Sequence, residues 1–484
     1  MNRRDFLRLL GAGAMSMAMP GISAAKSKSN NPNIIFILTD DMGPWAFGAA
    51  GDKNARTPNL DKLRAAGARL TNCYSPTPVC SPARASIMTS RYGTELGITD
   101  YIKPSLKIGL GQEFVTWPRL LEKAGYSTAL VGKWHLGDED EFYPTNFGYQ
   151  EFTGFRAGGA TSLDPKVEID RKVRTVKGYT PDILTDHAMD FIRRKKQGPF
   201  LLSLHFWAPH ANTKNRTPDG DRTWLPLSDA DWTKFKDMDP SIPNPDYPNL
   251  DIARVKRMMR EYLGSIASVD RNIGRVTQLL DELDLSDNTV IIFTSDHGFN
   301  MGHNGIWHKG NGRWILTTND GSRPNMYDNS MLVPALIRWP KVIKPGTTVD
   351  QTLTHLDWLP TIAAMAGTAA ADDAVIHGRN FLPLLKGRKP KWDNDLFAQY
   401  NMRGAGDMRT YYSGRWKLVR DFKHKIKDEF YDIESDPAEH NNLIDSPDPK
   451  IQKQIKKLDA KLLQKMRSIN DIIKLPANKP KRRT

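Results

Sequence analysis

The chain has 484 residues, of which 39% are hydrophobic and 26% are charged. A chain of this length and composition can bury one large core and a smaller one, which excludes a disordered protein and a collagen-like repeat. Two cysteines exclude a disulfide scaffold, and the formal net charge of +14 favours an anionic partner such as nucleic acid, a membrane surface or an acidic glycan. Part of this charge lies in a basic tail at 471–484, so charge alone does not choose among these partners.

Residues 1–25 have the pattern of a signal peptide. Arg3 and Arg4 open the segment, about a dozen apolar residues follow, and small residues end it near Ala25. The paired arginines resemble a twin-arginine signal, which indicates an exported protein, periplasmic or secreted. An N-terminal amphipathic helix of the folded domain is the alternative. No other run approaches about 18 continuous apolar residues, so we expect no membrane span.

Four continuous apolar runs each end in polar or ionisable residues. Such runs are typical of parallel strands that are buried on both faces, and ligands bind at the carboxyl ends of these strands. The runs and the residues that follow them are Asn33–Thr39 with Asp40 and Asp41, Ser127–Val131 with Lys133 and His135, Phe200–Phe206 with His210, and Thr289–Thr294 with Asp296 and His297.

Helical patterns alternate with these runs. Capping residues and apolar spacing predict helices from Thr57 to Gly67 and from Trp117 to Ala124, and a long amphipathic helix from Ile252 to Leu283. The alternation predicts an α/β fold, in which a large, mostly parallel sheet carries helices on both faces. We expect this catalytic domain to span 31–370.

Beyond about residue 370 the pattern changes. Four short strand-like segments and then a helical pattern follow, at 396–401, 410–412, 416–419, 429–432 and 450–466. They predict a C-terminal subdomain at 371–470, with a small antiparallel sheet and a helix.

Cys80 begins the sequence Cys-x-Pro-x-Arg, which continues with Pro82 and Arg84. A nearby cation favours the thiolate, so one interpretation is a reactive cysteine of low pKa. A buried free cysteine and a disulfide bond to Cys73 are the alternatives.

The acidic pairs at the strand ends indicate a metal site. Carboxylates gathered in a low-dielectric cleft would repel one another unless a metal ion, or Lys and Arg side chains, neutralised them. Oxygen-rich ligation suits a hard ion such as Ca²⁺ or Mg²⁺. The cationic residues at the other strand ends, with Lys309, suit an anion held against that metal. Taken singly, each residue also fits a helix cap, a surface lysine or a hydrogen-bonded core histidine.

Six short motifs contain these residues in one order along the chain. They are Asp40-Asp41, Cys80-Ser81-Pro82-Ala83-Arg84, Gly132-Lys133-Trp134-His135-Leu136-Gly137, Ala208-Pro209-His210, Asp296-His297-Gly298 and Trp307-His308-Lys309-Gly310. Together they resemble the type I, formylglycine-dependent sulfatases, and the likeness extends from about Asn33 to Leu443. The resemblance implies the alkaline-phosphatase-like fold, with a central mixed sheet and a smaller C-terminal four-stranded antiparallel sheet.

The resemblance also implies that a formylglycine-generating maturation enzyme oxidises Cys80 to formylglycine. The aldehyde hydrates to a geminal diol, of which one hydroxyl attacks sulfur and the other later expels sulfate by regenerating the carbonyl. A Ca²⁺ ion would be bound by Asp40, Asp41, modified Cys80, Asp296 and His297.

The resemblance assigns further roles to the cationic residues. Arg84 would hold the diol oxygens, and Lys133 with Lys309 would neutralise charge on the sulfate. His210 would protonate the departing alcohol, and His135 would take the proton from the second hydroxyl.

Three features depart from the family pattern. His297 stands where asparagine or glutamine is commoner, and because imidazole is a poor calcium ligand, this position admits Mg²⁺ or a transition metal. Phosphonate and phosphodiester hydrolases of the superfamily also have Asp-His there, but they tend to lack the paired aspartates. Met88 and Ser90 replace the more usual Leu and Gly, and Asn311–Pro324 is inserted after the last motif.

Two irregular segments, Asn212–Leu250 and the insertion, are the candidate substrate-binding walls. They have cations and aromatic faces that suit a sulfated sugar, or that pack the loops themselves, at Arg313, Trp314, Arg323, Trp224 and Trp232. With the export signal and the basic charge, they favour a sulfated polysaccharide or oligosaccharide, for example of marine algae, and neither nucleic acid nor a membrane. The alternatives are a phosphonate monoester or phosphodiester hydrolase and a non-enzymatic anionic-glycan-binding protein.

Overall fold

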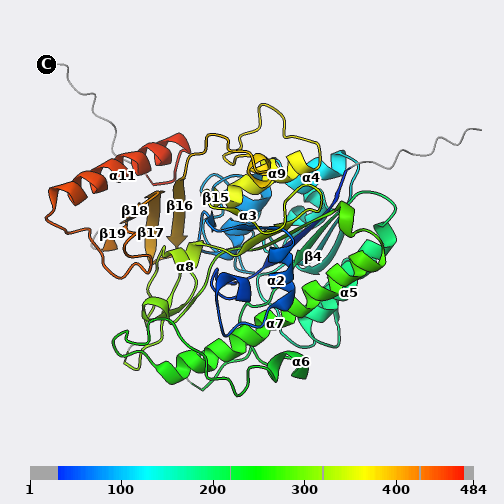
Figure 1. Cartoon of the computed structure of the whole chain (residues 1–484), viewed down its shortest axis with the longest axis horizontal. Helices are drawn as coiled ribbons and strands as arrows, with labels where there is room; N and C mark the ends of the chain where they lie inside the picture. The colour runs from blue at the N-terminus through cyan, green and yellow to red at the C-terminus, as the bar shows by residue number, and fades with distance from the viewer. Residues whose placement is uncertain (1–30, 219, 319–320, 425–426, 474–484) are drawn as a thin grey trace, which may run out of the picture. The chain divides into compact units, whose positions relative to one another are not determined.

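A ten-stranded mixed sheet forms the centre of the computed structural model, which describes residues 31–218, 220–318, 321–424 and 427–473 (Figure 1). In spatial order its strands are β14 (Thr347–Val349), β2 (Ala68–Leu70), β13 (Ala335–Arg338), β9 (Thr289–Ser295), β1 (Asn33–Thr39), β8 (Phe200–His205), β4 (Ser127–Lys133), β5 (Glu151–Phe155), β6 (Lys166–Ile169) and β7 (Lys172–Thr175). The predicted signal peptide at 1–25 and the tail beyond residue 473 lie outside the described residues.

The four predicted strands, β9, β1, β8 and β4, are neighbours in this sheet and run parallel. Ile34 of β1 lies between Val290 of β9 and Leu201 of β8, so these strands end at the same edge of the sheet. Every residue of β1 is buried, which explains why its sequence is a continuous apolar run. The predicted α/β fold is confirmed, and antiparallel pairs at β13 and at β5 to β7 make the sheet mixed.

Helices cover both faces of the sheet (Figure 1). Their bounds are α2 (Pro58–Ala65), α3 (Cys80–Thr89), α4 (Trp117–Lys123), α5 (Thr180–Lys195), α7 (Ile252–Glu282) and α9 (Trp358–Met365). Ile35 and Ile37 of β1 pack in one apolar cluster with α2, α5 and α7, whereas Ile34 and Phe36 pack in another with α3, α4 and α9. Because successive side chains of a strand point to opposite faces, the two clusters are the two sides of the sheet.

A separate antiparallel sheet and a helix follow towards the C-terminus, as predicted. They are β16 (Asp395–Met402), β17 (Gly406–Ser413), β18 (Trp416–Asp421), β19 (Glu429–Asp432) and α11 (Pro449–Ser468). Leu458 and Leu462 of α11 pack on Leu418 and Phe430 of the sheet. Contacts group the chain after Asn30 into one compact unit, and the boundary at residue 370 stays a prediction.

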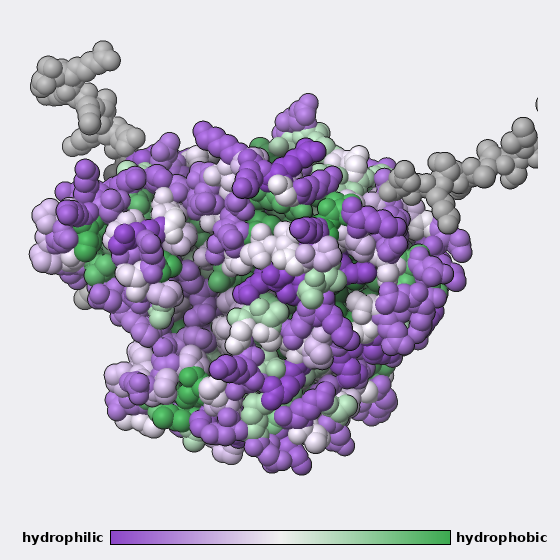
Figure 2. Space-filling view, in the orientation of Figure 1, coloured by the Kyte–Doolittle hydropathy of each residue, from purple (hydrophilic) through white to green (hydrophobic). Residues whose placement is uncertain are grey.

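Short elements complete the described chain. They are β3 (Cys73–Tyr74), α6 (Asp229–Trp232), β10 (Asn300–Met301), β11 (Ile306–His308), β12 (Arg313–Trp314), α8 (Asp328–Met331), β15 (Leu353–Thr354) and α10 (Leu382–Leu385), with 3-10 turns at 48–50, 140–142, 144–147, 286–288, 303–305 and 355–357. None of the helices in the described ranges has the length and apolar character that a membrane span needs. Figure 2 shows that hydrophilic residues cover most of the face seen in Figure 1, with apolar side chains in small groups.

Candidate active site

The acidic residues that follow β1 and β9 meet at the carboxyl edge of the sheet. The N–H of Asp41 donates to Asp296 Oδ1 at 3.3 Å. Asp41 adopts the left-handed backbone conformation, with φ at 69°, which short polar side chains tolerate better than most. Asp40, Asp41, Asp296 and His297 are all completely buried. The predicted meeting of the two pairs is therefore observed, in a place that water does not reach.

Cys80 is the first residue of α3 and lies against this acidic cluster. Lys309 connects the two, because its Nζ lies 4.0 Å from Cys80 Sγ and donates to Asp41 Oδ1 at 2.5 Å. Both cysteines are free thiols, so the alternative of a disulfide bond to Cys73 is wrong. The start of a helix also favours negative charge at residue 80.

Each carboxylate of the cluster is paired with its own cation. The pairs are Lys133 with Asp40, Lys309 with Asp41, and Arg84 with Asp296. Arg84 Nε donates to Asp296 Oδ2 at 3.0 Å, and its Nη1 donates to the carbonyl of Lys133, also at 3.0 Å. Arg84 therefore joins α3 to the ends of β4 and β9, and the buried charges are compensated as such charges must be.

The cluster also has acceptor atoms that no described residue uses. Oδ1 of Asp40 and Oδ2 of Asp41 are buried and have no hydrogen-bond partner among the described residues. One ligand atom from each of four residues lies within 4.8 Å of all the others, in the set Asp40, Asp41, Asp296 and His297. Because unpartnered buried carboxylate oxygens are costly unless a cation binds them, this donor set fits a divalent metal ion.

His297 presents its Nε2 atom to the cluster. This atom lies 3.2 Å from Asp41 Oδ1 and 3.4 Å from Asp296 Oδ1. On the other side of the ring, Nδ1 donates to the carbonyl of Gly298 at 2.9 Å. In the neutral ring this bond places the proton on Nδ1 and makes Nε2 an acceptor, which lies 3.3 Å from Lys309 Nζ and has the lone pair that a metal ion needs.

The buried charges determine the protonation states of the cluster. Burial would raise the pKa of the Cys80 thiol, but Lys309 and Lys133 hold it well below its ordinary value. Burial also opposes ionisation of Asp40, yet the ammonium of Lys133 holds its pKa well below the usual range. Asp296 differs, because burial and then the charge of Asp40 raise its pKa to about 6. The site thus favours negative charge at residue 80 and at Asp40.

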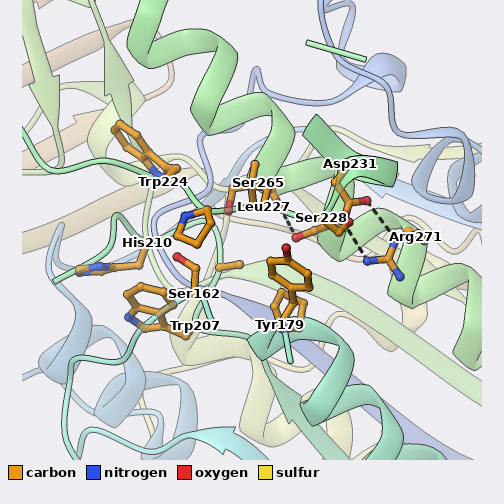
Figure 3. A pocket seen from close by; sticks show the side chains of 14 residues that line it. Ser162, Tyr179, Trp207, His210, Trp224, Leu227, Ser228, Asp231, Ser265 and Arg271 are labelled. Atoms are coloured by element: carbon orange, nitrogen blue, oxygen red, sulfur yellow. Dashed lines mark hydrogen bonds and ion pairs between the residues drawn. The ribbon is translucent and has the colours of Figure 1, made fainter. Parts of the chain in front are cut away.

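His210 lies near the second carboxylate oxygen of Asp41, the one that Lys309 does not contact, and it lines a small cavity (Figure 3). Its Nε2 is 3.8 Å from Asp41 Oδ2, its Nδ1 donates to the carbonyl of Ala211 at 2.8 Å, and its ring stacks on Trp207. Burial lowers the pKa of His210, even though Asp41 attracts the proton. The cavity of about 20 Å³ has room for about one water molecule.

His135 completes the predicted set. Its Nε2 donates to the carbonyl of Ile102 at 3.0 Å, whereas its Nδ1 is buried and has no partner among the described residues. In the neutral ring Nδ1 is therefore the atom that can accept a proton. His135 also helps to lower the pKa of Cys80, after the larger effects of the two lysines.

The predicted substrate walls pack largely on the protein itself. Trp224 is 1% exposed, and its indole N–H donates to the carbonyl of Pro209 at 2.6 Å. Arg323 pairs with Glu429 at 3.2 Å. The alternative, that these side chains pack the loops, is confirmed for Trp224. Arg323 keeps 33% of its side chain exposed, and its contact with substrate stays a prediction. Arg313 is exposed, and its contact with substrate stays a prediction.

Comparison with models of known protein families identifies the family of the chain. The family model described as Sulfatase matches residues 32–368, well over half of the chain. The chain belongs to the sulfatase family. A second family model, described as N-sulphoglucosamine sulphohydrolase, C-terminal, matches residues 322–468. The predicted resemblance is therefore confirmed in both parts of the fold.

Individual relatives of this sulfatase match over most of their length. The N-acetylglucosamine-6-O-sulfatase of Bacteroides thetaiotaomicron is 28% identical, over 90% of this chain and 86% of the relative. The ulvan-active sulfatase of Formosa agariphila is also 28% identical, over 93% of this chain and 84% of the relative. A solved structure of a protein in complex with its substrate D-glucosamine-2-N,6-O-disulfate has a TM-score of 0.77 at 26% identity, covering 91% of this chain and 99% of that one.

In this sulfatase, three polar side chains that the sequence did not single out hold Lys309 in place. Asn325 Nδ2 lies 3.4 Å from the carbonyl of Lys309 and 3.3 Å from that of Gly310, and donates to both. Asn300 donates to the carbonyl of the residue before Lys309 at 2.9 Å and to Ser330 Oγ at 2.7 Å. Ser330 Oγ donates in turn to Asn325 Oδ1 at 2.7 Å. No spacing rule marks isolated Asn and Ser residues, so only the fold reveals this group.

Proposed function

We propose that this protein is a carbohydrate sulfatase, a sulfuric ester hydrolase that removes sulfate from a sulfated polysaccharide or oligosaccharide after Cys80 has been oxidised to formylglycine. The observation that carries the proposal is the position of Cys80, 4.0 Å from Lys309 and beside two carboxylates with unpartnered oxygens. The names of two relatives, an N-acetylglucosamine-6-O-sulfatase and an ulvan-active sulfatase, support a carbohydrate substrate. The signal-like residues 1–25 support an exported enzyme.

A divalent metal ion completes the proposed site. The residues that would hold it are Asp40, Asp41, Asp296, His297 and the converted residue 80. When bound, the ion would polarise the oxygens of the nucleophile and of the sulfate. We propose Ca²⁺, because three carboxylates suit a hard ion, and Mg²⁺ or a transition metal as the alternative that imidazole admits.

The side chains of the chain itself bind the anion and move the protons in this proposal. Lys133 and Lys309 would neutralise the sulfate where negative charge develops, and Arg84 would orient residue 80. His210 would act in its doubly protonated form, in which Nδ1 keeps its bond to the Ala211 carbonyl and Nε2 gives its proton to the departing alcohol. His135 would accept a proton at Nδ1, the atom that has no partner in the described part of the chain.

A desulfation screen tests this proposal. The protein is produced with and without a formylglycine-generating enzyme and incubated with a panel of defined sulfated oligosaccharides, and released sulfate is measured by ion chromatography. Mass spectrometry of the peptide that contains Cys80 gives the converted fraction. We expect sulfate release to rise with that fraction and to vanish in Cys80→Ala. Full activity in a protein that retains the thiol would contradict the mechanism.

The same preparation separates sulfatase from the competing reaction classes. We expect a higher kcat/KM for an aryl sulfate than for an aryl phosphodiester or phosphonate monoester, because the paired aspartates at 40 and 41 distinguish the chain from those hydrolases. The opposite preference would replace the sulfatase with a phosphonate or phosphodiester hydrolase. Glycan binding that persists in the absence of any release would indicate a binding protein.

A further inference from the structure

A short loop connects the catalytic cluster to the protein surface. Ile102 is buried; its N–H donates to Ser81 Oγ at 2.9 Å, and its carbonyl accepts from His135 Nε2 at 3.0 Å. Ser81 follows Cys80 directly, so Ile102 is fixed between two residues of the site. Its neighbours on both sides are exposed: Tyr101 retains 40% of its accessible surface, and Lys103 is exposed as well.

A second segment, far away in the sequence, meets this loop. Arg403 lies in the turn between β16 and β17. Its backbone N–H donates to Asp100 Oδ2 at 3.2 Å, its Nε lies 3.7 Å from the same oxygen, and its Nη2 donates to the carbonyl of Tyr101. Tyr400, three residues earlier in β16, packs in the same apolar cluster as Cys80. The strand that leads into the turn therefore borders the nucleophile position.

These contacts place two cations at one exposed aromatic ring. The guanidinium of Arg403 is 5.0 Å from the centroid of the Tyr101 ring, and Lys103 Nζ is 5.8 Å from it. The Arg403 side chain is 39% exposed and shares its charge with Asp100. Lys103 forms no ion pair with the residues described, so one positive charge beside the ring is uncompensated.

This combination has the chemistry of an anionic sugar site. An exposed tyrosine offers a flat apolar surface on which the C–H face of a sugar ring can pack, and its two rotatable bonds are cheap to order. Arg and Lys next to it can bind a sulfate or carboxylate by charge-assisted hydrogen bonds.

We propose that Tyr101, Lys103 and Arg403 bind the sugar unit next to the one that carries the cleaved sulfate, and that this neighbouring unit bears a sulfate or carboxylate. The inference rests on the proposed sulfatase function and adds the substrate class: an oligosaccharide with anionic groups on adjacent units. It also supplies sugar contacts that one predicted wall residue does not offer, since Trp224 is buried.

The kinetic test compares two substrates. One is the oligosaccharide that the converted enzyme desulfates fastest in the screen above, and the other is an aryl sulfate, which has no neighbouring sugar. The measured quantity is the ratio of their kcat/KM values. We expect this ratio to fall about tenfold in Tyr101→Ala and in Lys103→Ala, mainly through a higher KM for the oligosaccharide. Added salt should raise the KM of the wild type for the oligosaccharide more than it raises that of Lys103→Ala.

Two variants serve as controls. Tyr101→Phe keeps the ring and should retain the ratio of the wild type. Lys107→Ala removes an equal charge from an exposed residue of the same loop and should leave the ratio unchanged. The proposal is overturned if Tyr101→Ala and Lys103→Ala keep the ratio, if Lys107→Ala lowers it equally, or if both substrates lose efficiency in parallel.

A binding experiment keeps this test independent of turnover. Isothermal titration of Cys80→Ala with the same panel of oligosaccharides is compared with titration of Cys80→Ala combined with Lys103→Ala. We expect about tenfold weaker binding in the double variant for ligands with anionic groups on adjacent units. An absence of sulfate release by converted wild type would refute the sulfatase function, whereas equal affinity of the two Cys80→Ala proteins would refute the sugar site.

Discussion

Replacing Asn325 with aspartate tests whether the position of Lys309 depends on the polar group behind it. The side chain keeps its shape, and its remaining oxygen can still accept from Ser330 Oγ at 2.7 Å. It loses the Nδ2 donor, which serves the carbonyls of Lys309 at 3.4 Å, Gly310 at 3.3 Å and Arg323 at 3.1 Å. Because a carboxylate oxygen then faces three carbonyl oxygens, two of them in buried contacts, we expect a loss of about 2–4 kcal/mol in the free energy of unfolding.

The expected kinetic effect follows from the distances around Lys309. Its ammonium lies 2.5 Å from Asp41 Oδ1 and 4.0 Å from Cys80 Sγ, so a shift of the backbone moves it relative to both. Misplacement of a catalytic group by about 1 Å can cost about a hundredfold in rate, and we expect kcat on an aryl sulfate to fall at least about tenfold. Urea unfolding and steady-state kinetics on the converted enzyme measure the two effects.

A matched substitution separates positioning from general destabilisation. Asn272 on α7 is also fully buried and donates to Asp182 and to the carbonyl of Ser268, at 2.7 and 2.9 Å. Asn272→Asp should lose stability but keep kcat within about twofold, because it touches none of the site residues. The reasoning is refuted if Asn325→Asp is destabilised to a similar extent and yet keeps kcat.

Three further outcomes are expected. Chelation of divalent ions should lower both the thermal midpoint and sulfate release, and Ca²⁺ should restore both, whereas an unchanged midpoint in calorimetry would argue against the metal site. Gly132→Ala should destabilise by about 3 kcal/mol or more in urea unfolding, because φ is 118° and a Cβ would lie 1.9 Å from the carbonyl oxygen of His205. Asp395 accepts from Lys461, Ser413 and Tyr411, and although burial opposes it, these bonds lower its pKa. Since the folded-state pKa is the lower one, this stability is present above the unfolded pKa and is lost as pH falls through the folded value. Asp395→Asn should therefore cost about 1–3 kcal/mol at pH 7 in urea unfolding, and progressively less as the pH falls through the folded-state pKa.

The sheet and most of its site could be predicted because burial leaves a strong pattern. A parallel strand that is covered on both faces must be apolar throughout, and the first polar residue after it marks its carboxyl end. β1 and β9 show this pattern, with Asp40 and Asp296 immediately after them. Once the strands are neighbours, the meeting of these residues requires only that the strands be parallel and in register.

The helix that begins at Cys80 left no such pattern. All ten residues of α3 are buried, including Ser81, Arg84 and Ser86, so its sequence lacks the alternation of apolar and polar faces that indicates a helix. The substrate side was equally hidden, because Tyr101 and Arg403 are about three hundred residues apart and meet only in the folded chain. Aromatic residues gave a wrong indication for Trp224. The sequence suggested that its ring could contact a sugar, but the ring is buried.

Burial makes the strands recognisable in the sequence. It also explains why the site contains a cationic side chain for each carboxylate. Asp40, Asp41 and Asp296 are fully buried at the carboxyl edge of the sheet, so their mutual repulsion is screened much less than it would be in water. Arg84, Lys133 and Lys309 reach them from α3, β4 and the segment after β11, so the charges balance only if all of these elements are correctly placed. A slip of one residue in β9 would turn its side chains to the opposite faces of the sheet and leave Arg84 without Asp296. The proposed anion site can therefore form only when the strands pair in the correct register.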